Sequence, residues 1–130
     1  MIQIIYSHST PTYSQAMEIV TKNIHVIKTF ELDTDFIHHK PFEITELFNG
    51  ERRRLLEIKL SNGEVLKNHK ANEPITVFCV SGNGTFKAGE NLEDEIELKS
   101  GTLLTLEAEV PHEIEAKPNL RLLLTKFKKD

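Results

Sequence analysis

Two stretches decide the fold: Gly63-Glu-Val-Leu-Lys-Asn-His-Lys-Ala-Asn-Glu-Pro-Ile75 and Gly101-Thr-Leu-Leu-Thr-Leu-Glu-Ala-Glu-Val-Pro-His112. Each begins at a glycine that suits a turn, continues with residues that suit a strand, and carries one histidine. The histidines are His69 and His112. The sequence therefore predicts two related β segments, far apart along the chain, that each present an imidazole.

The chain around these stretches, from residue 51 onward, is nearly pure β in pattern. Short apolar or alternating runs are separated by groups rich in glycine, asparagine and proline, which is typical of a sandwich or closed barrel. The strands are expected at 55–60, 75–80, 85–88, 95–98, 102–106, 112–116 and 120–127. Turns are expected at 61–63, 81–84, 89–91, 99–101 and 117–119.

The first 50 residues have a mixed pattern. Tyr13, Ala16, Met17 and Val20 recur at helical spacing and predict an amphipathic helix after a proline. A strand is expected at 23–30, and a short helix at 41–47 that begins with proline and stops at Asn-Gly. The prediction is one structural domain, with an N-terminal extension over 1–50 that packs on a barrel over 51–130.

Composition excludes several classes of function. The chain has 130 residues and a net charge of −4, and its densest basic run, Arg52-Arg53-Arg54, is flanked by glutamates, so nucleic-acid binding is not expected. The single cysteine, Cys79, cannot form an internal disulfide and fits a reducing, cytoplasmic location. Neither a signal peptide nor a membrane span is expected.

The two stretches resemble the two sequence motifs of the cupin superfamily. Gly63 and His69 have the spacing of the first motif, and Gly101 and His112 that of the second, with Pro111 before the histidine as is common there. The chain is similar to small bacterial single-domain, RmlC-like cupins. The resemblance implies an all-β double-stranded β-helix, or jelly-roll barrel, with a short N-terminal extension containing a helix, and it implies a homodimer.

The resemblance also implies a set of four metal ligands, and two of them are replaced here. Ala71 stands at the second histidine position and Ile75 at the glutamate position, so only His69 and His112 match. The residues expected to line a barrel cavity are His69, Ala71, Ile75, Cys79 and His112. Glu73 could restore a set of two histidines and one carboxylate if the loop before Pro74 turned inward, and Cys79 could offer a thiolate, although an inert core cysteine is the simpler interpretation.

Three hypotheses for function follow. The first is a non-catalytic or weakly active protein that binds a small, mainly apolar or anionic molecule in the barrel cavity, with no cofactor. The second is a metal-dependent cupin enzyme, of the dioxygenase or isomerase type, with a weakly bound Fe, Zn, Mn, Ni or Cu ion on His69, His112 and Glu73. In the third, the protein has a sensing or scaffold role in which the cavity takes no part. Arg52-Arg53-Arg54 is interpreted as surface charge at a strand entry, with the alternative that one arginine reaches the cavity mouth and holds an anion.

Overall fold

The computed structural model describes residues 3–6, 17–20, 23–31 and 40–129, which fall into two compact units, Met1–Glu31 and Leu32–Asp130. The described residues of the smaller unit include three antiparallel strands in the order β1-β2-β3. They are β1 (Gln3–Tyr6), β2 (Met17–Val20) and β3 (His25–Val26). The larger unit begins well before residue 51, so the division lies earlier than the sequence indicated.

The N-terminal helix prediction is wrong where it can be checked. Met17 and Val20 belong to strand β2, which pairs with the Ile-rich strand β1; Tyr13 and Ala16 lie outside the described residues. Isoleucine and valine favour strands, and pairing with a neighbouring strand overrides a short helical spacing. The strand expected at 23–30 is confirmed only over β3. No helix in the described part of the chain is long and apolar enough to cross a membrane.

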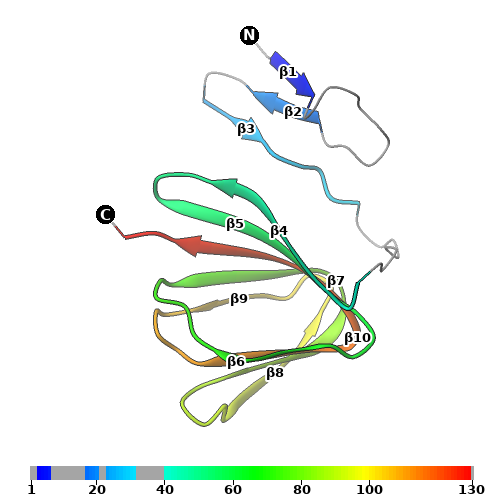
Figure 1. The fold of residues 1–130 in the computed structure, drawn as a ribbon, viewed down its shortest axis with the longest axis vertical. Coiled ribbons are helices and arrows are strands. Elements are labelled where there is room, and N and C mark those ends of the chain that lie inside the picture. The colour runs from blue at the N-terminus through cyan, green and yellow to red at the C-terminus, as the bar shows by residue number, and fades with distance from the viewer. Residues whose placement is uncertain (1–2, 7–16, 21–22, 32–39, 130) are drawn as a thin grey trace. The chain divides into compact units, whose positions relative to one another are not determined.

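In the described residues of the larger unit there are seven strands and no helix, so this part is all-β as predicted (Figure 1). They are β4 (Phe42–Asn49), β5 (Arg53–Leu60), β6 (Val65–His69), β7 (Ile75–Ala88), β8 (Asp94–Lys99), β9 (Leu103–Leu106) and β10 (His112–Phe127). The antiparallel ladder runs β4-β5-β10-β7-β8, with β6 added to β10 and β9 added to β7.

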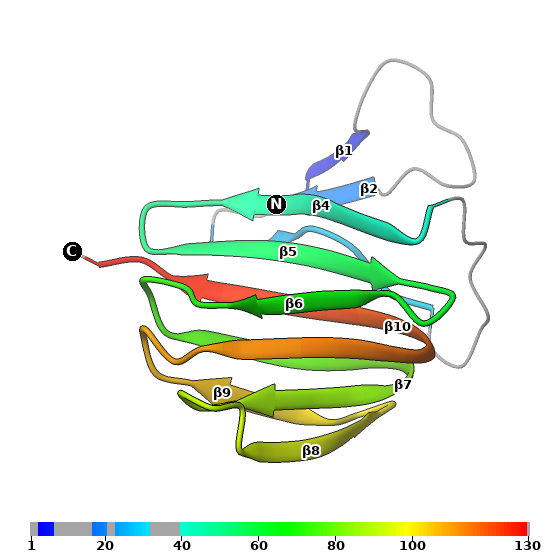
Figure 2. The same ribbon diagram turned by 60° about the horizontal axis from the view of Figure 1, so that its bottom comes forward.

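Strands β7 and β10 each take part in two sheets. The first half of β10 lies between β6 and the second half of β7, whereas its second half lies between β5 and the first half of β7. The long strands therefore join a β4-β5-β10-β7-β9 sheet to a β6-β10-β7-β8 sheet. Figure 2 shows β10 running out and returning between its neighbours. This arrangement is the jelly-roll barrel that the sequence predicted.

The points where β7 and β10 change sheet are two segments that were predicted as turns. Residues 81–84 and 117–119 lie inside continuous strands, where the ladder between β7 and β10 shifts its register. Gly82 has φ of +96°, and a Cβ there would lie 2.1 Å from the carbonyl oxygen of Asn119. Glycine therefore permits both the backbone angle and the close approach of the two bends. These two segments are therefore bends within β7 and β10, and neither of them ends a strand.

Strand β4 replaces the short helix predicted at 41–47. Its sequence alternates apolar and polar residues from Phe42 to Thr45, and it pairs antiparallel with β5. Pro41 stands just before the strand, where its missing N–H removes no bond from the ladder. The carbonyl of Pro41 accepts a 2.9 Å hydrogen bond from the Ser61 N–H. The helix prediction was wrong because a proline can precede either a helix or a strand. Pairing with β5 makes this segment a strand.

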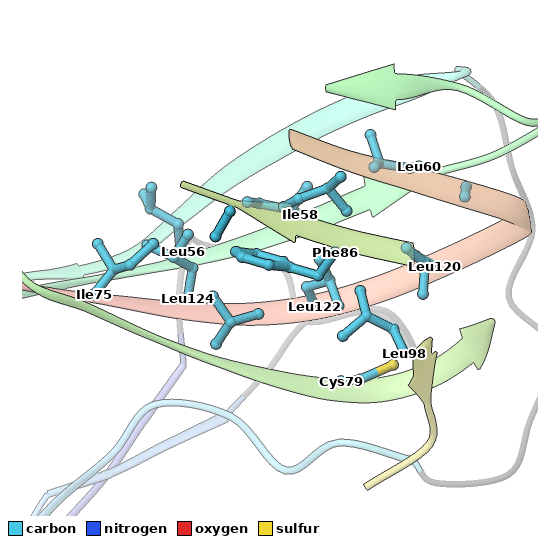
Figure 3. Packing of buried hydrophobic residues seen from close by; sticks show 14 residues of the cluster. Leu56, Ile58, Leu60, Ile75, Cys79, Phe86, Leu98, Leu120, Leu122 and Leu124 are labelled. Carbon is cyan, nitrogen blue, oxygen red and sulfur yellow. The ribbon is translucent and has the colours of Figure 1, made fainter. Parts of the chain in front are cut away.

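The core fills the space between the two sheets (Figure 3). Alternate residues of β5, β7 and β10 point inward and are almost fully buried, as expected for the apolar side of a half-buried strand. The buried apolar residues are Leu56, Ile58, Leu60, Ile75, Val77, Cys79, Phe86, Ala88, Leu98, Ile114, Ala116, Leu120, Leu122 and Leu124.

Candidate functional site

The two histidines singled out in the sequence lie side by side. His69 ends β6, His112 begins β10, and the two are direct partners in the antiparallel ladder. Their ring centroids are 4.2 Å apart and the ring planes meet at 61°, an edge-to-face contact. Direct partners carry their side chains on the same face of a sheet, which explains how residues 43 positions apart meet.

The two rings sit in different surroundings. His112 is 2% exposed and lies nearly parallel to the Phe86 ring, with a centroid distance of 5.6 Å and an interplanar angle of 8°. His69 is exposed at the end of its strand. Figure 2 shows the end of β6 and both ends of β10 at the same end of the barrel. The pair thus has one buried ring and one that a molecule in solution can reach.

Backbone carbonyls fix the protonated nitrogen of both rings. Nδ1 of His69 lies 2.8 Å from the carbonyl oxygen of Lys67, and Nδ1 of His112 lies 3.0 Å from that of Val110. A carbonyl oxygen only accepts, so in each case Nδ1–H donates. In the neutral form of either ring, the lone pair is then on Nε2, the nitrogen on the far side of the ring from its carbonyl.

The charge state of His112 follows from its surroundings. Burial lowers the pKa of His112 below its ordinary value of 6.5, outweighing the Val110 carbonyl, which raises it, and the charges of His69 and Lys126 lower it further. His112 is therefore neutral at pH 7 and offers Nε2 as a hydrogen-bond acceptor or as a metal ligand.

Ile75 and Cys79 lie in the packed core of the barrel. Ile75 is 2% exposed and Cys79 is 0% exposed, both on the inward side of β7. The Cys79 thiol donates a 3.5 Å hydrogen bond to the carbonyl of Ser81, and burial raises its pKa to about 11. The thiol stays protonated at pH 7, which does not favour a thiolate ligand. Contact of either residue with a ligand stays a prediction.

Glu73 does not join the histidines in a metal-binding group. Among the described residues, no three histidine, cysteine, aspartate or glutamate side chains are placed to hold an ion. The carbonyl of Ala71 accepts a 2.9 Å hydrogen bond from the Glu109 N–H, and the carbonyl of Pro74 accepts one of 3.1 Å from Phe127. The backbone of the loop is thus hydrogen-bonded on both sides of Glu73. Ala71 itself packs half-buried against the core.

Phe86 and Lys126 belong to the site, although the sequence analysis overlooked them. Phe86 stacks on His112, and the charge of Lys126 acts on the same ring. On β10 the inward positions are Leu120, Leu122 and Leu124, so the next inward position is Lys126. The period-2 alternation of β10 was therefore the signal that could have identified it.

A separate groove of about 420 Å³ lies on the β7–β8 side of the barrel, near the bends. It is lined by Asn83, Gly84, Thr85, Glu95, Ile96, Glu97 and Lys117. None of these residues belongs to the histidine pair, and the bends in the middle of β7 and β10 lie at the opposite end of the barrel from the two ends of β10 (Figure 2). The groove is thus a different feature from the candidate site.

Comparison with known proteins identifies the fold. No protein-family model matches the sequence, and no curated protein matches it significantly. Several solved structures match with a TM-score of 0.64, at identities that indicate a shared fold alone.

One is a cupin superfamily protein from Desulfitobacterium hafniense, 14% identical, covering 74% of this chain and 84% of that one. Another is an RmlC-like cupin from Desulfovibrio desulfuricans, 19% identical, covering 78% and 95%. A third is a protein of unknown function from Streptococcus pyogenes, 15% identical, covering 84% and 99%. The barrel therefore has the cupin fold, as the two motifs predicted.

Proposed function

We propose that the barrel binds a small molecule at the His69–His112 pair, and that binding rather than catalysis is its role. The observation that carries the proposal is the fixed tautomer of both rings, with each Nδ1–H held by a backbone carbonyl. Two Nε2 lone pairs then face a donor group of the ligand, such as a hydroxyl. Phe86 provides an apolar wall beside the buried ring.

The support around the rings favours holding a ligand over moving protons. A histidine that acts as a general base is commonly oriented by a carboxylate, which stabilises the imidazolium formed in the reaction. Here neutral carbonyls orient both rings, and burial disfavours the charged form of His112. These surroundings stabilise a neutral acceptor, which suits recognition.

A second candidate is a weak divalent-metal site on the same two rings. An Nδ1–H bond to a backbone carbonyl is the usual way in which a protein orients a metal-binding histidine, leaving Nε2 for the ion. Two donors are fewer than the three that a catalytic zinc site has. We therefore expect only weak binding of Zn²⁺, Ni²⁺ or Cu²⁺, with no structural role.

The test follows the histidine side chains by ¹H–¹⁵N NMR while small hydroxylated acids, polyols and Zn²⁺ are added in separate titrations. We expect at least one organic class to shift the His69 and His112 resonances together, and His69→Ala to abolish that response. His25→Ala, in the N-terminal unit, is the control and leaves the response unchanged. If only Zn²⁺ shifts the pair, the metal site is the better proposal; if nothing shifts it, both are wrong.

A further inference from the structure

The barrel end that carries the histidines also carries two cations from the other sheet. Lys126 on β10 is the direct partner of Arg54 on β5 in the antiparallel ladder. Direct partners place their side chains on the same face, and Lys126 follows Leu124 at the next inward position. Lys126 and Arg54 therefore continue the inner face of the barrel at its end.

Lys126 is a half-buried cation that has no anionic partner among the described residues. It forms no ion pair with any described residue, whereas Arg54 donates from Nε to Glu46 at 2.8 Å. Lys126 lies close to the C-terminal end of β10, and both ends of that strand are at the same end of the barrel (Figure 2), so Lys126 is at the histidine end. The charge of Lys126 also lowers the pKa of His112. An ammonium drawn partly out of water and left unpaired costs free energy, and an anion bound beside it would offset that cost.

The arginine beside it can take part in the same recognition. Arg54 uses one of its five N–H donors for Glu46, and that pair is partly open, with side chains 39% and 43% exposed. A planar guanidinium recognises carboxylate or phosphate oxygens through its remaining donors. The barrel end thus presents an ammonium, a guanidinium and two imidazole acceptors.

We infer that the ligand is a small multivalent anion, either a polycarboxylate or a phosphate ester, bound between Lys126, Arg54 and the His69–His112 pair. The inference deepens the proposed function and rests on it. One anionic group binds Lys126, a second faces Arg54, and a hydroxyl of the ligand donates to Nε2 of a histidine. Of the run Arg52-Arg53-Arg54, Arg54 is then the arginine that binds the anion, because its side chain continues the inner face of β5.

The experiment measures affinity by NMR titration of the wild-type protein and two variants. The probes are malonate and inorganic phosphate as dianions, tartrate as a hydroxylated dianion, and malonamide as a neutral match for malonate. Lys126→Gln removes the charge at the site, and Lys129→Gln removes an exposed charge beyond the end of β10. The two variants each lose one ammonium group from the same region of the chain, so they have the same net charge.

We expect the dianions to bind the wild type, with tartrate tighter than malonate and malonamide not binding measurably. Lys126→Gln should weaken dianion binding about 10- to 100-fold, the range for a hydrogen bond to a charged group. Lys129→Gln should change it less than about twofold, because an exposed charge is screened. A preference for phosphate over both carboxylates would identify the phosphate-ester arm of the class.

Three outcomes would overturn one claim or the other. Equal dianion affinity in wild type and Lys126→Gln would refute the anion inference. If neutral polyols shift the histidines and no dianion does, the proposed binding function stands and the anion inference is wrong. If dianions bind through Lys126 and His69→Ala has no effect on malonate or tartrate, the anion site exists but the histidine site is refuted.

Discussion

The bend of β7 offers a direct test of the fold, through the change Gly82→Ala. Gly82 has φ of +96°, and an L residue in a left-handed conformation costs about 1–2 kcal/mol. The added Cβ would lie 2.1 Å from the Asn119 oxygen, far inside any ordinary contact, so the two bends must separate. Overpacking of this kind costs about 1–3 kcal/mol. The sum is a loss of about 2–5 kcal/mol in the free energy of unfolding.

Two other glycines allow the backbone cost and the packing cost to be measured separately. Gly63 has φ of +75° and nothing within 4 Å of its Cβ position, so Gly63→Ala should cost only the backbone term, about 1–2 kcal/mol. Gly84 has no positive φ, but its Cβ would lie 2.3 Å from the Glu115 oxygen, so Gly84→Ala should cost only the packing term.

The assay is urea denaturation of the three variants and the wild type, followed by far-ultraviolet circular dichroism. We expect Gly82→Ala to have the lowest midpoint of unfolding, with the cost close to the sum of the other two. Equal midpoints for Gly82→Ala and Gly63→Ala would show that the two bends do not touch, and would refute the account of how β7 and β10 change sheet together.

Further predictions concern the core, the thiol, the buried ring and the assembly. Leu122→Ala, at a 0% exposed position, should destabilise the protein by about 3–5 kcal/mol in urea denaturation, while Leu103→Ala, at 66% exposure, should change stability by less than about 0.5 kcal/mol. Cys79, with a pKa raised to about 11, should not react with a disulfide reagent at about pH 8 until the chain unfolds, and rapid labelling of the native protein would contradict its burial. The pKa of His112 is lowered by burial, so the unfolded chain takes up a proton that the folded protein resists; stability should fall as pH drops below about 6.5, and His112→Gln should flatten that dependence in thermal melts at a series of pH values. The predicted homodimer can be checked by light scattering after size-exclusion chromatography, where a monomer mass would contradict it.

The fold could be predicted because its signals are local and repeated. Alternation of apolar and polar residues along β5 and β10 indicates half-buried strands directly. The strand ends were harder to predict, because the same residues that close a hairpin also bend a continuous strand. Gly82 and Pro118 were taken as turns, and only the pairing of β7 with β10 on both sides of the bends shows that the strands continue.

The N-terminal half was predicted less well for a different reason. Over Phe42–Asn49 and Met17–Val20, short segments carry weak preferences, and the available partner strand decides the structure. A local sequence pattern does not identify the strand with which a segment will pair. Strand pairing is a long-range property, so helix-like spacing over four residues is a poor guide there.

The candidate site was half predictable. The family spacing identified His69 and His112, and the ladder places them as direct partners. Ile75 and Cys79 share the inward parity of β7, but parity alone does not give depth, and both lie in the packed interior. Lys126 comes from the other sheet, so its approach to His112 depends on the closure of the barrel, which no local pattern reports.

The measurement that tests the central claim most directly is a long-range ¹H–¹⁵N correlation spectrum of the histidine rings, combined with proton–proton contacts between them. The account predicts that His69 and His112 both carry the proton on Nδ1 at neutral pH, and that their ring protons show a direct contact, since the centroids lie 4.2 Å apart. Adding tartrate should then shift the Nε2 resonances of both rings together. Protons on Nε2, or rings without a mutual contact, would contradict the shared site.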